Sequence, residues 1–245
     1  MYIFYTYIIF FIRFYILYTF TRITLFFHFH PYKPILNSKT KSIIMGTLPP
    51  PRFCEKKLEV KDVNFPYGSQ DNLFWQIVNK IYELNLLFDN SQKAITQRKK
   101  FLIENQIGIC DIVESCQREK FDASDSTMQD IILRDILFYL KKYKDINKIF
   151  FTGGSSKNSP EYFLKKLLKE NNIKFVLKNQ TNPKIHQFVF DNRIFTTISL
   201  ISPSNAANKS IGANNLYKEK KEKNPKYTTF NFRVEQYEKF FRSLE

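Results

Sequence analysis

Residues 42–51 read SIIMGTLPPP, and residues 148–154 read KIFFTGG. Each stretch is a short apolar run that stops at a turn-forming segment, which is typical of a strand entering a loop. In the first stretch, Ser42–Met45 is the predicted buried strand, and three prolines stiffen the loop after Gly46. In the second stretch, residues 148–152 are the predicted strand and Gly153–Gly154 the turn.

Helical patterns alternate with further strand patterns along the rest of the chain. Ser126 and Gln129 form a capping box at the start of one predicted helix, and Ser159 followed by Pro160 begins another. The alternation predicts a three-layer α/β/α sandwich with a central, mostly parallel four-to-five-stranded sheet. The predicted helices cover residues 74–88, 91–104, 126–144, 159–171 and 232–244, and the remaining predicted strands cover residues 107–113, 175–177, 185–190 and 193–201.

In sheets of this kind, ligands bind beyond the carboxyl ends of the strands. This rule places the expected site at the loops of residues 46–72 and 202–212. Other short motifs carry less weight. The segment GGSSK at 153–157 lacks the spacing of a phosphate-binding loop, and neither Cys110 nor Cys116 has a histidine nearby in sequence to activate it.

The composition favours a polyanionic partner. The chain has 245 residues, with 38 Lys and Arg against 23 Asp and Glu, and its formal net charge is +15. Such an excess attracts nucleic acid or anionic lipid. The three cysteines form no C-x-x-C motif and the three histidines have no metal-ligand spacing. We therefore expect no metal, no cofactor and a reducing compartment.

Residues 1–29 are an aromatic and β-branched run interrupted by Arg13 and Arg22. A membrane-spanning helix would fit the length, but Arg13 near its middle costs about 2.5–3.5 kcal/mol. A signal peptide would need a basic start and a small-residue cleavage site. We expect instead an extension outside the folded domain or a mis-assigned start, with a single domain over residues 30–245. Membrane attachment is not expected, and the expected location is the cytoplasm of a bacterium, at the nucleoid, or the nucleus of a eukaryote.

Five segments of the chain follow one another in the order IIMGTLPP (43–50), PYGSQDNLFW (66–75), GICDIVESCQREKFDAS (108–124), IFFTGG (149–154) and ISLISPSNAAN (198–208). This order resembles the uracil-DNA glycosylase superfamily. The chain is most similar to the branch that removes deaminated bases such as hypoxanthine and to the mismatch-specific uracil-DNA glycosylases. The likeness runs from about His30 to the segment TTFNFRVEQYEKFF at 228–241.

The resemblance implies roles for the first two segments in cleaving the N-glycosidic bond of a base flipped out of DNA. Tyr67 would stack on the flipped base, and Asn72 would position the attacking water. The backbone of Gly46, Thr47 and Leu48 would line the base pocket, with N–H groups aimed at the charge that develops on the leaving base.

The resemblance also implies a role for the serine-bearing turn. Ser202 would hydrogen-bond the base, and the residues after it would enter the minor groove. Apart from the resemblance, the lysine-rich run at 217–226 is either a solvated segment or a phosphate contact, to which Lys209 would add. The minor-groove residues are Pro203, Ser204, Asn205 and Ala206.

Ordinary structural roles compete with these. Asn72 lies where a helix N-cap is expected, and Phe74 and Trp75 suit a helix core. The sequence also departs from the family pattern. Thr47-Leu48 stand where other branches carry an acidic or amide residue, residues 69–71 read SQD where near relatives often have His-Pro-Arg, and three cysteines cannot supply a four-ligand iron–sulfur cluster.

Three hypotheses therefore stay open, of which a membrane-attached protein that depends on its N-terminal segment ranks last. The first is a monofunctional, metal-independent DNA glycosylase that acts as a monomer on double-stranded DNA containing a deaminated or mismatched base. The second is a non-catalytic nucleic-acid-binding module on the same scaffold.

Overall fold

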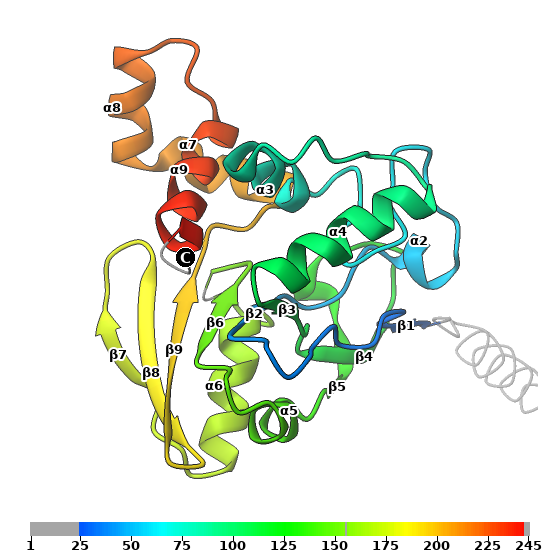
Figure 1. Cartoon of the computed structure of the whole chain (residues 1–245), viewed down its shortest axis with the longest axis vertical. Coiled ribbons are helices and arrows are strands. Elements are labelled where there is room, and N and C mark those ends of the chain that lie inside the picture. The colour runs from blue at the N-terminus through cyan, green and yellow to red at the C-terminus, as the bar shows by residue number, and fades with distance from the viewer. Residues whose placement is uncertain (1–24, 155, 243–245) are drawn as a thin grey trace, which may run out of the picture.

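The computed structural model of the chain describes residues 25–154 and 156–242 (Figure 1). Its centre is a six-stranded sheet with the strand order β3-β2-β6-β9-β8-β7. The strands from β3 to β9 run parallel, and β8 and β7 extend the sheet as antiparallel strands. The strands are β2 (Ser42–Met45), β3 (Ile107–Ile109), β6 (Lys148–Phe151), β7 (Val176–Asn179), β8 (Lys184–Phe190) and β9 (Arg193–Ser199).

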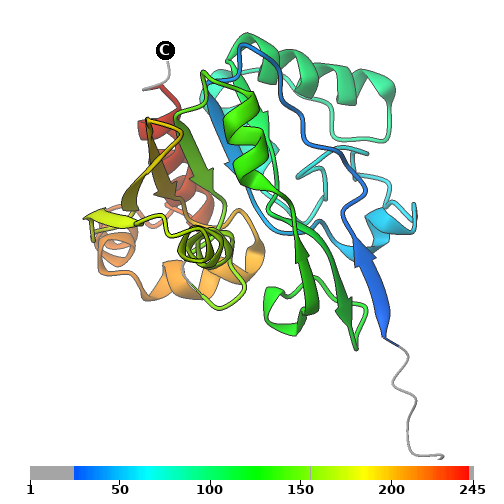
Figure 2. The same cartoon turned by 90° about the horizontal axis from the view of Figure 1, so that it is seen from below.

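Helices cover both faces of this sheet, as the sequence predicts, and α4 and α5 lie on opposite sides of the strands in Figure 2. Neighbouring strand residues point to opposite faces, so Ile44 and Phe150 enter one core while Ile43 and Phe151 enter the other. The helices are α2 (Pro51–Cys54), α3 (Phe74–Tyr82), α4 (Gln92–Glu104), α5 (Ile136–Lys142), α6 (Pro160–Glu170), α7 (Asn208–Ala213), α8 (Asn215–Lys223) and α9 (Thr229–Phe241).

The expected strand number was too low, because both extended segments before β9 join the sheet. Several helix boundaries also differ. Helix α3 ends at Tyr82 rather than residue 88, because Glu83 adopts a left-handed conformation with φ 51°. Helix α6 begins as predicted, with the Ser159 side chain accepting a hydrogen bond from the Tyr162 N–H.

A second sheet, with the strand order β1-β4-β5, shows that the predicted helix over residues 126–144 is wrong in its first part. Its strands are all antiparallel: β1 (Phe26–Phe29), β4 (Val113–Arg118) and β5 (Gln129–Leu133). Residues 126–144 are therefore not one helix. Strand β5 occupies the first part, and α5 begins only after Asp135, whose side chain accepts from the Phe138 N–H. Pairing with β4 satisfies the backbone of β5, so tertiary hydrogen bonds override the local helical pattern.

Strand β1 also moves the start of the folded unit. Residues 26–29 pair with residues 118–115 of β4, so the folded part begins no later than Phe26 and not at residue 30. Residues 1–24 lie outside the described part, and the interpretations of that segment stay predictions. Within residues 25–154 and 156–242, no helix combines the length and apolar character needed to cross a membrane.

Candidate active site

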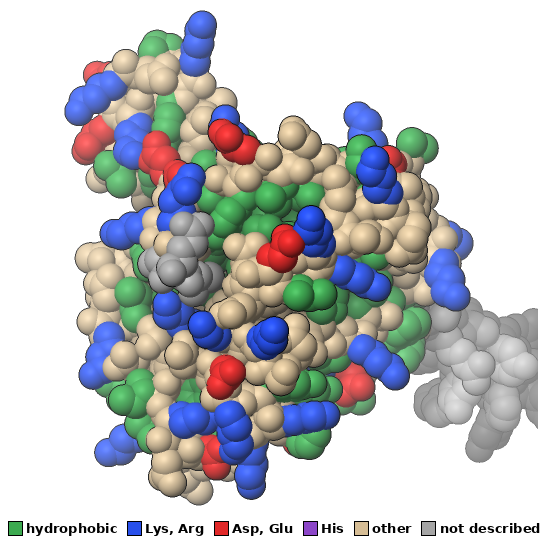
Figure 3. All heavy atoms as spheres, viewed as in Figure 1, with side chains coloured by type: hydrophobic (Ala, Val, Ile, Leu, Met, Phe, Trp, Pro, Cys, Tyr) green, Lys and Arg blue, Asp and Glu red, His purple; other side chains and the backbone are tan. Residues whose placement is uncertain are grey.

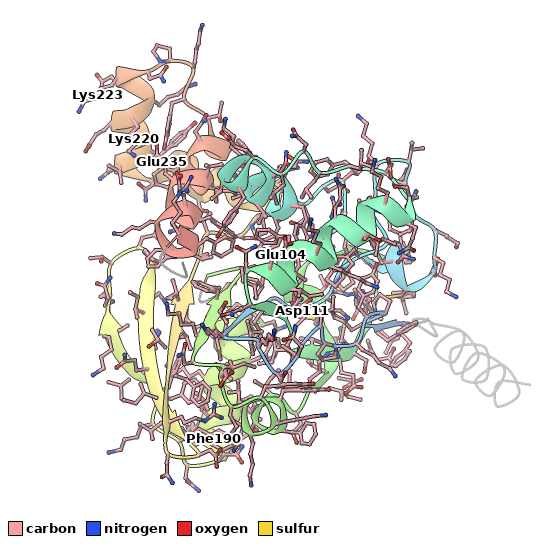
Figure 4. All side chains as sticks on the ribbon, viewed as in Figure 1. Glu104, Asp111, Phe190, Lys220, Lys223 and Glu235 are labelled. Atoms are coloured by element: carbon pink, nitrogen blue, oxygen red, sulfur yellow. The ribbon has the colours of Figure 1, made fainter. Side chains whose placement is uncertain are left out.

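The carboxyl ends of the four parallel strands meet at one cavity of about 790 Å³. Gly46 follows β2, Thr152 follows β6, and Asp111 and Ser202 lie just beyond β3 and β9. Figure 4 labels Asp111 near the middle of the molecule. The cavity lies at the edge where parallel sheets bind ligands, and its volume falls in the ~300–1,000 Å³ range of small-molecule sites.

Most of the predicted site residues line this cavity. Asn205 and Lys209 do not, and both are exposed. The structure therefore brings together two loops that are more than a hundred residues apart in the sequence. The predicted residues that line the cavity are Gly46, Thr47, Leu48, Tyr67, Asn72, Ser202, Pro203, Ser204 and Ala206.

Gly46 is packed too tightly for a side chain. A Cβ at this position would lie 2.5 Å from Tyr67 Oη and 3.1 Å from Asp111 Oδ1. The Gly46 N–H donates to Asp111 Oδ1 at 2.6 Å, so this amide is not available to a leaving base as predicted. In the described part of the chain, the amides of Thr47 and Leu48 have no acceptor, and they remain the candidate donors of this loop.

The Tyr67 side chain is held in place at its hydroxyl and at its ring. Its hydroxyl donates to Asp111 Oδ1 at 2.6 Å and lies 3.2 Å from Thr152 Oγ1, while its ring lies 4.8 Å from that of Phe74. Burial, followed by the charge of Asp111, raises the tyrosine pKa well above 10, so Tyr67 stays a neutral donor. The residue has a left-handed backbone with φ 59°, a strained conformation for a non-glycine residue that fixes the direction of the ring.

Asp111 organises the floor of the cavity, and the sequence analysis did not identify it as a site residue. Besides the Gly46 and Tyr67 donors, it is bonded through Oδ2 to His30 Nε2 at 2.9 Å. His30 Nδ1 accepts from the Tyr32 N–H, so Nε2 carries the imidazole proton that points at the carboxylate. Three of the four lone-pair positions of Asp111 are thus occupied. The carboxylate thus holds Gly46, Tyr67 and His30 together and has little capacity left to hold a water.

Asn72 contacts the first residue of α3. Its Oδ1 accepts from the Phe74 N–H at 2.9 Å and so satisfies the first amide of the helix, although the N-cap position itself is Leu73. Its side-chain NH₂ has no acceptor among the described residues, and the residue borders the cavity. The backbone also pairs with the serine turn: Asn72 forms a bridge with Ser204, and the Leu73 N–H donates to the Pro203 oxygen at 2.9 Å.

The serine turn, residues 202–206, is stabilised by hydrogen bonds from its backbone to its own serine hydroxyls. Ser202 Oγ accepts from the Ser204 N–H, and Ser204 Oγ accepts from the Ala206 N–H, each at 3.2 Å. Both serine hydroxyls therefore keep a proton that can be donated elsewhere, and both residues line the cavity. Because the bridge to Asn72 joins this turn to the start of α3, the water-positioning and base-contacting candidates form one connected rim.

Asp125 is a second carboxylate that the sequence analysis missed. It lies in the 3₁₀ turn Asp125–Thr127 between β4 and β5 and lines the cavity. The Thr47 hydroxyl donates to its Oδ1 at 2.7 Å, which ties the first loop to this turn. Burial raises the pKa of Asp125 above its usual value, with the charge of Asp111 adding to the effect.

The unusual SQD segment has a structural explanation. Arg52 donates to Asp62 Oδ2 at 2.7 Å, to Ser69 Oγ at 2.8 Å and to Asp71 Oδ2 at 3.0 Å. Asp62 in turn accepts from the Gln70 N–H at 2.8 Å. The side chains of Ser69 and Asp71 and the backbone N–H of Gln70 thus hold the loop around the Arg52–Asp62 pair. These contacts within the chain explain the loop shape.

The described residues contain no group of three or more His, Cys, Asp or Glu side chains placed to hold a metal ion. The cavity is instead lined by Tyr67, by Asn72, by the serines of the serine turn and by the carboxylates of Asp71, Asp111 and Asp125. This combination defines an α/β/α protein with a polar ligand site at the carboxyl edge of its sheet.

Comparisons with known proteins add a structural relative. No protein-family model matches the chain, and no curated protein sequence matches it. The chain is similar to the solution NMR structure of a "putative Uracil DNA glycosylase" from Methanosarcina acetivorans, with 20% sequence identity and a TM-score of 0.52. The match covers 89% of this chain and 99% of the archaeal chain. The two proteins therefore share a fold over nearly their whole described length.

Proposed function

We propose that the protein is a monofunctional DNA glycosylase that hydrolyses the N-glycosidic bond of a deaminated base, such as hypoxanthine or uracil, in double-stranded DNA. The observation that carries the proposal is the convergence of Tyr67, Asn72 and the serine turn around one cavity. The fold shared with the archaeal protein and the net charge of +15 support it. The enzyme would act as a monomer without a metal, in the cytoplasm or nucleus, and leave an abasic site.

The base would be flipped out of the duplex and bound against Tyr67. Because the Tyr67 hydroxyl is bonded to Asp111, the ring is fixed before a base arrives, and stacking needs no further ordering. Negative charge develops on the leaving base as the bond breaks. The amides of Thr47 and Leu48 and the hydroxyl of Ser202 would stabilise that charge as hydrogen-bond donors.

The attacking water would be held by Asn72. The Phe74 N–H fixes the direction of the amide oxygen and leaves one of its lone pairs and the NH₂ group for a water. A neutral amide suffices because the sugar is already cation-like in the transition state of glycoside hydrolysis. The carboxylate of Asp111, which has three of its four lone-pair positions occupied, would stabilise the sugar cation through space. The proton that the water loses as it adds to the sugar would end on the departing base anion.

The test is a panel of duplexes that contain uracil, hypoxanthine or xanthine, read as strand scission after alkali. Asn72→Ala should lower the excision rate at saturating enzyme by about 10²–10⁴-fold, the range for a positioned catalytic group, and leave duplex affinity nearly unchanged. Asn72→Ser is the matched control, because its oxygen can still cap α3 and should restore thermal stability but not activity. No scission with any substrate would refute the proposal, and equal loss of affinity and rate in Asn72→Ala would refute the role of Asn72.

One observation favours the alternative of a non-catalytic binding module. Thr47-Leu48 stand where other branches carry an acidic or amide residue, and Asn72 already uses one oxygen lone pair to accept from the Phe74 N–H. This alternative predicts DNA binding that weakens steeply with salt and no scission even with enzyme in large excess over substrate.

A further inference from the structure

We call residues 208–226 the basic arm, and its α8 part projects from the body of the molecule in Figure 1. The arm contains α7, α8 and the loop that follows, with six lysines against two glutamates. Helix α8 has no buried residue, so packing of the helix itself does not explain its presence. In Figure 3, Lys and Arg side chains lie on this projection together with several Asp and Glu side chains.

The arm is rigidly attached to the cavity rim. It continues directly from the turn in which Ser204, Ala206 and Ala207 line the cavity. The fully buried side chain of Arg233 donates to the Ser204 oxygen and to Asn208 Oδ1, each at 2.9 Å, and so joins the rim to the first residue of the arm.

A small aromatic cluster fixes the far half of the arm. Tyr227 and Phe232 are buried together with Ile211, and Tyr217 of α8 packs against them. Lys220 forms an ion pair with Glu235 of α9, and the two are labelled side by side in Figure 4. The direction of α8 relative to the cavity is therefore set by contacts at both its root and its middle.

Two of the lysines serve these internal contacts. Lys220 pairs with Glu235, and Lys221 donates to the Pro225 oxygen. The other lysines of the arm are exposed and form no ion pair with the described residues. These exposed lysines are Lys209, Lys218, Lys223 and Lys226.

We infer that the basic arm binds the phosphates of duplex DNA on one flank of the flipped nucleotide, an inference that rests on the proposed function. The partner is the sugar–phosphate backbone, because exposed lysines supply charge without the planar geometry used to read bases. Helix α8 has nine residues. At about 1.5 Å per residue it extends ~13 Å, which matches roughly four base pairs at ~3.4 Å each.

The first test compares two triple variants of equal charge. The arm variant removes three positive charges from the basic arm by Lys218→Gln, Lys223→Gln and Lys226→Gln. The control variant removes three positive charges from exposed positions of α6 by Lys165→Gln, Lys166→Gln and Lys169→Gln. Binding of a lesion-free duplex is followed by fluorescence anisotropy over a salt series. Each lost phosphate contact lowers the slope of log affinity against log salt by ~0.9, which is about 8-fold in affinity at ~0.1 M salt, so three contacts give up to ~500-fold.

We expect the arm variant to lose slope and affinity and the α6 variant to retain both. Equal effects of the two variants would overturn the inference. So would an arm variant that keeps its DNA affinity but no longer binds vesicles containing phosphatidylserine, because the arm would then serve a lipid surface. This test measures binding and needs no cleavage, so it can be interpreted even if the base-excision panel fails. If the enzyme is active but the arm variant keeps the wild-type salt slope, the DNA-binding role of the arm is refuted and the proposed function is not.

The second test uses duplexes that carry a tetrahydrofuran abasic analogue with one flank shortened to about two base pairs. The wild-type protein should lose affinity when one particular flank is shortened and not when the other is. The arm variant should be insensitive to either change. Equal sensitivity of the wild-type protein to both flanks would overturn the one-sided contact.

Discussion

Replacing Arg233 by methionine should loosen the serine turn. The guanidinium is fully buried on α9 and donates from Nε to the Ser202 oxygen and from Nη2 to the Ser204 oxygen, each at 2.9 Å. Nη1 donates to Asn208 Oδ1 at 2.9 Å and to the Thr229 oxygen at 3.2 Å. No carboxylate of the described chain forms an ion pair with it, and burial lowers its pKa.

The size of the effect follows from which acceptors lose their donors. The Ser202 oxygen loses its donor entirely, at a cost of about 1–3 kcal/mol, whereas the Ser204 oxygen keeps the Ala207 N–H and loses about 0.5–1.5 kcal/mol. Relief from burying an uncompensated cation offsets part of this. We expect Arg233→Met to lower the free energy of unfolding by about 2 kcal/mol, or ~4–8 °C in Tm for a chain of this length.

The assay must separate loosening of the turn from a general loss of stability. Arg98→Met is the matched control, because Arg98 is equally buried and donates to the Leu87 and Ala94 oxygens on the α4 side of the molecule. Both variants should lower Tm. Measured well below either Tm, only Arg233→Met should weaken duplex binding and raise the enzyme concentration needed for half-maximal single-turnover excision. If both variants keep wild-type values of these two quantities, Arg233 acts only as a core residue.

Three further expectations concern the floor of the cavity and the pH dependence of stability. Gly46→Ala should lower Tm through its clash with Tyr67 Oη, and adding Tyr67→Phe should recover part of the loss; strictly additive losses would exclude the clash. Burial and then the charge of Arg118 lower the pKa of His28 to about 4, so the unfolded chain takes up its proton first. The free energy of unfolding should therefore fall by up to about 3 kcal/mol as the pH drops from 6.5 to 4. His28→Asn should weaken this pH dependence, measured by urea titrations at several pH values; an unchanged pH dependence would assign it to another titrating group. Burial raises the pKa of Asp125, so its ionisation costs stability above the unfolded value of 3.8; Asp125→Asn should stabilise the protein at neutral pH, with a gain that shrinks toward pH 3.8, and a neutral-pH loss would contradict this.

The fold was predictable where the signal is local. The runs SIIM and KIFF and the Ser159-Pro160 start of α6 are found where expected, because apolar periodicity and helix caps depend on a few neighbouring residues. Residues 129–133 were assigned to the wrong class because their strand exists only through pairing with β4. For the lysine-rich segment at 217–226 the sequence left open a solvated helix or loop, and helix α8 covers most of it, starting after the Asn214 cap, whose side chain accepts from the Tyr217 N–H.

The site was predictable in part for the same reason. Tyr67, Asn72 and Ser202 belong to segments whose spacing resembles a known family, and all three border the cavity. Asp111 was missed because its partner His30 lies 81 residues away. A usable signal was nevertheless present. Asp111 directly follows the apolar run IGIC inside the predicted strand 107–113, and β3 in fact ends at Ile109, which places Asp111 beyond the carboxyl end of the strand, where parallel sheets bind ligands.

Under the proposed function, the charges around the site can be compared with those of a nucleotide undergoing base loss. The cavity lining carries both signs: the carboxylates Asp71, Asp111 and Asp125 and the cations Arg52 and Lys157. Arg52 is already paired with Asp62 and Asp71, so its charge is balanced within the chain. Asp111 and Asp125 would then face the sugar as it becomes cationic. Further cations lie beyond the cavity, with Arg233 behind the serine turn and the exposed lysines on the basic arm, where the flanking phosphates would remain anionic.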